Sequence, residues 1–262
     1  MRLAIVSLTL AAAAIPTAVK SAGEDARAFM EDVFNRSSWK DMQADLELVL
    51  KNKSGDKRVK RLKLWSKNND KGETSMLMRF TAPADVRGTG FLLIEHKEGR
   101  DDRRLFLPAL RRVKRLTGSG GRANFMSSDF SFYDIGKPKL GDWKFSFTGE
   151  ETVDGVKCKA AEGMAASADV VSDTGYSKVV WYVDPARKIV LAADYYDKDG
   201  TLFKKMKVLE VKDVAGRPFA THMSMQDVTT GHSSEMVFAN LVTDKGLGDS
   251  VFTERNLKRW RR

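Results

Sequence analysis

The sequence predicts a mainly β fold in which about a dozen antiparallel strands share one sheet. Apolar and polar residues alternate with a period of two along most of the chain, and the residues of tight turns separate these runs. A single aromatic segment, Asn124–Ile135, interrupts the pattern. A sheet of so many strands must curl or close, so we expect a half-open barrel with an N-terminal helix and a helical plug.

Residues 1–23 have the pattern of a secretory signal peptide. Arg2 gives a positive start, an almost uninterrupted apolar run extends from Leu3 to Ala14, and small residues follow Pro16. The run is too short for a transmembrane helix, so we expect export and one mature domain over residues 24–262. An uncleaved membrane anchor is the alternative.

A helix is expected over Glu24–Arg36, because apolar side chains recur at helical spacing and two acidic residues open the first turn. The period then changes to two. In Asp41–Lys51 the leucines fall on one face and charged residues on the other, as in a half-buried antiparallel strand. Further strands are expected over Lys57–Lys67, Thr74–Thr81 and Phe91–Lys97.

The stretch Arg103–Gly136 joins three unlike pieces. Two strand-like runs, Arg103–Leu107 and Arg111–Leu116, are separated by Pro108, which cannot donate a hydrogen bond to a ladder. A flexible loop with three glycines follows at Thr117–Arg122. The aromatic segment comes next, and because serines and aspartates interrupt it, we expect one or two helical turns that press its rings onto the sheet.

Seven more strands are expected in the second half of the chain, with turn residues between them. They are Trp143–Val153, Val156–Met164, Tyr176–Asp184, Lys188–Tyr196, Thr201–Asp213, Arg217–Val228 and Ser234–Thr243. The end of the chain, Ser250–Trp260, fits a short helix with Phe252 and Leu257 directed inward.

Composition and cysteine content exclude several classes of protein. The 262 residues are 42% hydrophobic and 31% charged, and the mean hydropathy of -0.38 argues against a multi-span membrane protein. Cys158 is the lone cysteine, so the chain has neither an internal disulfide nor a cysteine near the signal peptide for a lipid anchor. It alternates with charged lysines and is expected to point inward.

The net charge of +10 is compatible with nucleic acid, an anionic membrane or an acidic protein as partner, and export would remove the chain from nucleic acid. Enzymatic chemistry has little support. His96, His222 and His232 lie far apart, no close pair of carboxylates stands out, and Gly118–Gly121 lacks the ending of a phosphate-binding loop. We therefore expect no catalytic residues, no metal and no cofactor.

Two groups of residues are candidates for binding. The first is apolar and would either fill a core or line a cavity for an apolar ligand. Its members are Leu46, Leu48, Leu50, Met76, Met78, Phe80, Phe125, Met126, Phe130, Phe132 and Tyr133. The second is basic and would either protect an exposed strand or dock on an anionic membrane or an acidic partner. Its members are Arg103, Arg104, Arg111, Arg112, Lys114 and Arg115.

Three segments together resemble the LolA-like outer-membrane lipoprotein-sorting proteins of bacteria. They are Pro83–Leu92 (PADVRGTGFL), Leu105–Arg115 (LFLPALRRVKR) and Phe125–Asp134 (FMSSDFSFYD). The resemblance extends over nearly the whole mature chain. It implies an incomplete, strongly curved antiparallel β-barrel with helices over its open side. It also implies a periplasmic carrier whose apolar concave face shelters acyl chains.

The chain departs from the sorting carriers at one position. Those carriers have an arginine-proline pair after the second strand, where this chain has Trp65–Asn69 (WSKNN). The expected function is a non-catalytic carrier of lipoprotein acyl chains or another lipid toward the outer membrane. The alternative is an accessory protein for an inner-membrane lipid exporter or transporter. Expected partners are the acyl chains, an inner-membrane transporter and an outer-membrane acceptor, and the chain is expected to be a monomer.

Overall fold

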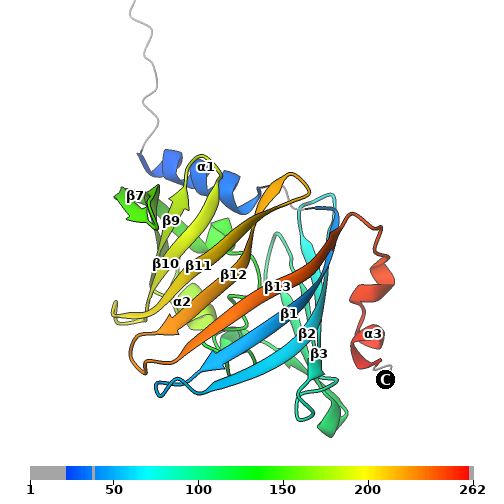
Figure 1. The fold of residues 1–262 in the computed structure, drawn as a ribbon. Coiled ribbons are helices and arrows are strands. Elements are labelled where there is room, and N and C mark those ends of the chain that lie inside the picture. Colours follow the sequence, from blue (N-terminus) through cyan, green and yellow to red (C-terminus); the bar gives the residue numbers. More distant parts are fainter. Residues whose placement is uncertain (1–21, 37–38, 260–262) are drawn as a thin grey trace, which may run out of the picture.

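The computed structural model describes residues 22–36 and 39–259 (Figure 1). The predicted signal peptide lies outside these residues, apart from its last two positions, which begin helix α1 (Ala22–Phe34). Among the described residues, no helix has the length and apolar content that crossing a membrane requires.

All 13 named strands form one antiparallel sheet, which confirms the predicted mainly β fold. The strands are β1 (Asp41–Lys51), β2 (Lys57–Asn68), β3 (Thr74–Ala82), β4 (Gly90–Ile94), β5 (Asp102–Leu107), β6 (Arg112–Leu116), β7 (Trp143–Val153), β8 (Val156–Ala165), β9 (Lys178–Asp184), β10 (Ile189–Tyr196), β11 (Leu202–Val214), β12 (Arg217–Asp227) and β13 (Ser233–Thr243). Their bounds agree with the predicted segments to within two residues, except that β4 ends three residues before the predicted strand Phe91–Lys97.

The sheet is curved but does not close (Figure 1). Neighbouring strands follow the chain from β1 to β6 and from β7 to β13, and the two halves meet where β1 pairs with β13. In that pairing Leu48 lies opposite Met236. Strands β6 and β7 are consecutive in the chain but form the two free edges of the sheet.

Tight turns join the long strands as the sequence predicts. Val153 of β7 pairs with Val156 of β8, so the turn between them holds only Asp154 and Gly155. Both have positive φ angles, 47° and 81°, as a two-residue turn of this kind requires. The same geometry joins β11 to β12 through residues 215 and 216.

Helices cover opposite faces of the sheet (Figure 1). Helix α1 packs on β7 and buries Ala26 and Met30. At the other end of the chain, α3 (Glu254–Lys258) and the preceding 3-10 turn η5 (Asp249–Phe252) lie on the outer, convex face. There Phe252 and Leu257 are buried on the sheet, as expected.

A short helix, α2 (Ala168–Thr174), was not expected from the sequence. The Ser167 hydroxyl accepts a hydrogen bond from the Val170 amide at its start, and Gly175 ends it with a φ of 84°. Seven residues between two strong strand patterns give too little periodicity to indicate a helix.

The segment Asn124–Ile135, which we call the plug, crosses from the β6 edge toward the β7 edge over the concave face. Its helical content is one 3-10 turn, η3 (Phe125–Ser127). Met126 and Ser127 have φ angles of 50° and 64°, which a regular helix does not allow. The structure therefore confirms the position of the plug over the concave face. Its helical part is a single irregular 3-10 turn, and the rest of the plug is not helical.

Candidate functional site

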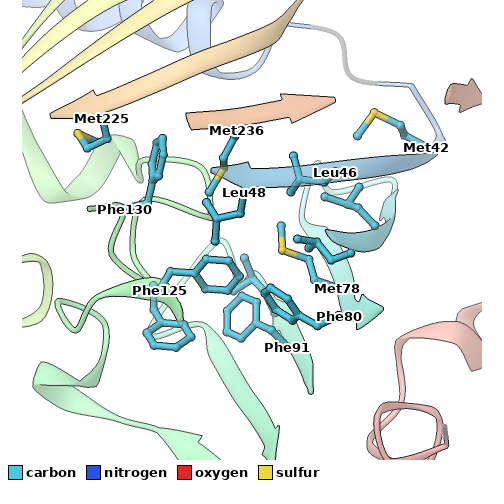
Figure 2. Packing of buried hydrophobic residues seen from close by; sticks show 14 of the residues in the cluster. Met42, Leu46, Leu48, Met78, Phe80, Phe91, Phe125, Phe130, Met225 and Met236 are labelled. Atoms are coloured by element: carbon cyan, nitrogen blue, oxygen red, sulfur yellow. The ribbon is translucent and has the colours of Figure 1, made fainter. Parts of the chain in front are cut away.

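An apolar cluster fills the concave side of the sheet beneath the plug (Figure 2). It contains all of the predicted cavity residues except Tyr133. Leu46, Leu48, Met78, Phe80, Phe125, Phe130 and Phe132 are buried in it, and Leu50, Met76 and Met126 are half-buried against it. Strands from both halves of the sheet contribute, because Met225 and Met236 also belong to this cluster.

The rings of the plug pack directly on the first half of the sheet. Phe125 is fully buried and lies 5.6 Å from the Phe91 ring and 6.0 Å from the Phe80 ring, centroid to centroid. Phe132 meets Phe125 edge to face at 5.4 Å. Such edge-to-face pairs add to the stability that apolar burial provides. The plug is thus part of the core in this state of the protein.

Tyr133 lies instead in a second apolar cluster, with α1, Trp143 and Tyr176. Trp143 Nε1 donates a hydrogen bond to its hydroxyl at 3.4 Å. Burial raises the pKa of Tyr133 well above its usual range, because the phenolate would be out of contact with water. This tyrosine therefore stays neutral and acts as a packing residue between the plug and the second half of the sheet.

Polar contacts join the plug to two strands of the sheet and to Tyr176, which lies between α2 and β9. The buried Lys60 on β2 donates to the backbone carbonyl of Met126. The Ser234 hydroxyl on β13 donates to Asp129 at 2.6 Å, and the Tyr176 hydroxyl donates to Asp134 at 2.8 Å. Burial, and then the neighbouring Arg58, lowers the pKa of Lys60.

An open pocket of about 320 Å³ lies between the two apolar clusters, where α1 approaches β10 and β12. We call it the end pocket. Its apolar lining includes Val33, Phe34, Trp39, Val190, Phe219 and Met223. Trp39 is part of the first cluster and Val33 of the second, so the pocket leads toward the seam between them.

Trp39 forms one wall of the end pocket. It is 8% exposed, and its ring meets Phe219 edge to face at 5.6 Å. Its indole Nε1 is buried and has no hydrogen-bond partner in the part of the chain that the structure describes. Buried indole N–H groups usually find an acceptor, so this donor is an exception.

Four cations, Arg36, Lys137, Lys188 and Arg217, form the polar part of the end pocket, and no acidic residue lines it. Lys188 Nζ lies 3.7 Å from Asp32 Oδ2, and Lys137 Nζ donates to an amide oxygen at 3.4 Å. Burial lowers the pKa of Arg36, and the nearby Arg187 and Arg217 lower it further. Asp184 raises this pKa by a smaller amount. The pocket is therefore electropositive.

The cations of the end pocket could not be identified from sequence. Arg36 follows the first helix, Lys137 follows the plug, Lys188 directly precedes β10, and Arg217 is the first residue of β12. Each looks like an ordinary solvated charge along the chain. Only the folded chain brings them around one opening, where the segments after α1 and after the plug meet the starts of β10 and β12.

A wider pocket of about 640 Å³ opens beside α2 and is lined mostly by polar residues. Its acidic residues are engaged in turns: Asp197 accepts hydrogen bonds from two backbone amides and so does Asp227. Lys198 pairs with Asp199 at 2.8 Å. Among the described residues, no group of histidine, cysteine, aspartate and glutamate side chains is arranged to hold a metal ion.

The predicted docking patch divides into two parts. Arg103 pairs with Asp101 at 2.7 Å, and Arg104 pairs with Asp102 and, at 2.7 Å, with Glu254 of α3, so these two arginines are structural. Arg111, Arg112, Lys114 and Arg115 are exposed on the β5–β6 hairpin. Leu110 at its turn is 63% exposed. We call residues Pro108–Arg112 the hairpin tip.

Comparisons with known proteins agree with this geometry. A family model described as an uncharacterized protein matches residues 72–259. No curated protein matches the sequence. The structure of a candidate outer membrane lipoprotein-sorting protein domain from Vibrio parahaemolyticus has a TM-score of 0.84 and 29% identity, and the match covers 90% of this chain and 100% of that one.

Two more solved structures place the fold. A LolA superfamily protein from Nitrosomonas europaea has a TM-score of 0.68 at 19% identity, and the match covers 90% of this chain and 100% of that one, which shows the LolA-like fold. A DUF1329 family protein from Desulfovibrio piger has a TM-score of 0.82 and 31% identity, over 90% of this chain and 98% of that one. The chain therefore belongs to the DUF1329 family and has the LolA-like fold.

Proposed function

We propose that this protein is a periplasmic, non-catalytic carrier that binds acyl chains of a lipoprotein or another lipid on its concave face. One observation carries the proposal. Long apolar side chains from both halves of the sheet line the concave face. The plug that lies over this first cluster is an irregular segment, not a further sheet or a long helix. A cover of this kind can be displaced without breaking a strand ladder.

The composition of the concave cluster suits an apolar ligand of variable shape. Met78, Met225 and Met236 are buried in it, and Met76, Met206 and Met223 pack around it. Methionine side chains are unbranched and flexible, so they adapt to different apolar partners. The candidate lipoprotein-sorting role of the Vibrio relative supports the same class of cargo.

The residues at the end of β2 leave the cargo open between a lipoprotein and another lipid. Trp65 stands near the position where sorting carriers have arginine, and its Nε1 donates to Gln43 at 3.1 Å. It lies against the cluster on the convex face, together with residues that α3 covers. A side chain placed there cannot guide a chain into the concave face, so we favour a lipid cargo without requiring lipoprotein transfer.

Native mass spectrometry tests the carrier function. The full chain, expressed with its own N-terminus and purified from the periplasmic fraction, should retain adducts with the mass of lipids that mild organic extraction removes. Recovery in the cytosol with the N-terminal residues intact would contradict the proposed localisation. A lipid-free protein that also fails to bind added fluorescent acyl probes would contradict the carrier function itself.

The hairpin tip favours a second candidate function, that of an accessory protein docked beside an inner-membrane transporter. Leu110 is exposed between Pro108 and two arginines, and two further cations follow on β6. Exposed apolar and basic residues on one loop suit a surface of anionic lipid headgroups. A carrier must also meet its donor membrane, so the two functions are compatible.

A further inference from the structure

We propose that the end pocket binds the carboxylate or phosphate headgroup of an anionic amphiphile, whose acyl chain enters between the two apolar clusters. This inference deepens the proposed carrier function and rests on it. It names the ligand class and assigns headgroup recognition to Arg36, Lys137, Lys188, Arg217 and the indole N–H of Trp39.

The charge of the lining favours an anion. Four of the lining residues are cations and none is acidic, although the whole chain carries 35 acidic residues. Low-dielectric walls focus such a field, because they screen charge less than water does. Arg36 and Arg217 both line the pocket and repel each other, and an anion bound between them would offset that repulsion.

The unpartnered indole of Trp39 is the second observation. Trp39 lines the pocket, and its Nε1 is buried and lacks an acceptor in the described part of the chain. An unsatisfied buried donor costs stability, and an added acceptor would remove that cost. A headgroup oxygen is an acceptor of the kind that this donor lacks.

The apolar lining favours an amphiphile over a free anion. Nine of the thirteen lining residues are apolar, and Trp39, Phe219 and Met223 join the pocket to the concave cluster. Its volume, about 320 Å³, is at the low end of the range of about 300–1,000 Å³ typical of ligand pockets. The pocket can therefore hold a headgroup and the first part of a chain, while the rest of the chain needs the seam between the clusters.

The test compares four probes by isothermal titration calorimetry. The probes that carry a chain are kept below the concentrations at which they aggregate. Palmitate and hexadecyl phosphate carry a chain and a charge, hexadecanol carries only the chain, and inorganic phosphate carries only the charge. We expect the two charged amphiphiles to bind roughly tenfold more tightly than hexadecanol, because one favourable desolvated charge contact is worth about that factor.

Two variants separate headgroup recognition from folding. In the Arg36→Gln/Lys137→Gln double variant, the preference for charged probes over hexadecanol should disappear while hexadecanol affinity stays the same. Trp39→Phe keeps a ring against Phe219 but removes the N–H, so it should weaken only the charged probes, by a few-fold. Arg255→Gln, an exposed cation on α3, is the matched control and should bind all probes as the wild type does.

Each result points to one conclusion. Equal affinity of the wild type for palmitate and hexadecanol, or an unchanged preference in the double variant, would overturn the headgroup site and leave the carrier function standing. Binding of inorganic phosphate as tight as that of hexadecyl phosphate, with no binding of hexadecanol, would show a free-anion site and overturn both proposals. Binding of no probe would also overturn both.

Discussion

Ser234 on β13 and Asp129 in the plug are joined by two reciprocal hydrogen bonds. The Ser234 hydroxyl donates to Asp129 Oδ2 at 2.6 Å and accepts the Asp129 backbone N–H at 3.0 Å. Ser234 is 1% exposed and Asp129 is 9% exposed. The pair connects the plug to β13, the strand that joins the two halves of the sheet by pairing with β1. It also brings the ionisable carboxyl group of Asp129 into the core.

The first prediction concerns the pH dependence of stability at Asp129. Burial raises the pKa of Asp129 above its ordinary value of 3.8, against smaller effects of Ser234 and Lys204. The folded state therefore holds this proton more tightly than the unfolded state. The resulting stabilisation is complete below pH 3.8 and is lost as pH rises through the raised pKa. We expect Asp129→Asn to be more stable than the wild type above that window, since asparagine can still accept the Ser234 hydrogen bond.

Urea unfolding of both proteins at a series of pH values measures this difference. Other carboxyl groups, such as that of Asp41, have lowered pKa values and act in the opposite direction, so only the difference between the two proteins isolates Asp129. The difference in unfolding free energy should grow with pH and then level off. A wild type that gains stability over Asp129→Asn as pH rises would show that the folded protein favours the carboxylate.

The second prediction concerns Gly121, in the glycine-rich loop before the plug. A Cβ atom at this position would lie 2.8 Å from the backbone oxygen of Asp173 in α2. The φ angle of Gly121 is −64°, so close packing and not backbone conformation explains the glycine. We expect Gly121→Ala to lower the unfolding free energy by about 1–3 kcal/mol, as overpacking does.

Gly141→Ala is the matched control for this change, because a Cβ there meets nothing within 4 Å. It should leave thermal and urea unfolding nearly unchanged. The alternative is that the flexible glycine loop acts as a hinge for the plug. A Gly121→Ala variant with wild-type stability and slower uptake of an acyl probe would support that hinge and contradict the packing explanation.

The strands could be predicted from sequence because each one carries its own evidence. In β1, the alternation that places Leu46 and Leu48 on one face is complete within the strand, and its turn residues follow directly. The buried position of Cys158 followed in the same way from the charged residues beside it. Local periodicity is enough wherever one face of a strand is buried and the other is solvated.

The backbone of the plug and the end pocket could not be predicted, because distant residues determine both. Met126 adopts a left-handed conformation, and its carbonyl accepts a hydrogen bond from Lys60, which is 66 residues away in the chain. Lys60 shares the buried face of β2 with Leu62 and Leu64 and is 3% exposed, but no local pattern indicates its partner in the plug. The end pocket likewise joins Trp39 to Phe219 through a pairing of strands that no local pattern indicates.

The third prediction concerns the hairpin tip. The Leu110→Ser/Arg111→Glu/Arg112→Glu variant should bind vesicles rich in phosphatidylglycerol much more weakly than the wild type. The reason is that each basic residue near an anionic surface contributes about 1 kcal/mol, and the exposed Leu110 adds apolar contact. Vesicle co-sedimentation at low and physiological salt measures the change.

Arg255→Glu changes one exposed charge on α3, outside the hairpin tip, and serves as the control. It should reduce vesicle binding only slightly, through the net charge. Equal loss in this control and in single variants of the tip would mean that binding depends on net charge alone. Equal binding of the wild type to neutral and anionic vesicles would remove the electrostatic docking role of the tip.

The last prediction asks whether the plug is a lid or only part of the core. Phe130 is 3% exposed and belongs to the same apolar cluster as Met225 and Met236 (Figure 2). Phe130→Ala should lower the unfolding free energy by about 3 kcal/mol, as expected for a large buried side chain. If the plug must move to admit a chain, the same change should also speed the uptake of a fluorescent acyl probe, because it removes contacts that hold the plug closed.

Phe252→Ala separates the two effects. Phe252 is 8% exposed and packs on the convex face with Leu77 and Phe106, away from the plug. Its loss should lower stability by a similar amount without changing the uptake of the probe.

Both variants are compared with the wild type by stopped-flow fluorescence at a temperature where all three remain folded. Faster uptake in Phe130→Ala alone assigns the gate to the plug, because general loosening of the fold would act in both variants. Equal rates in all three would leave Asn124–Ile135 as packing and would require the acyl chain to enter by another route, such as the end pocket.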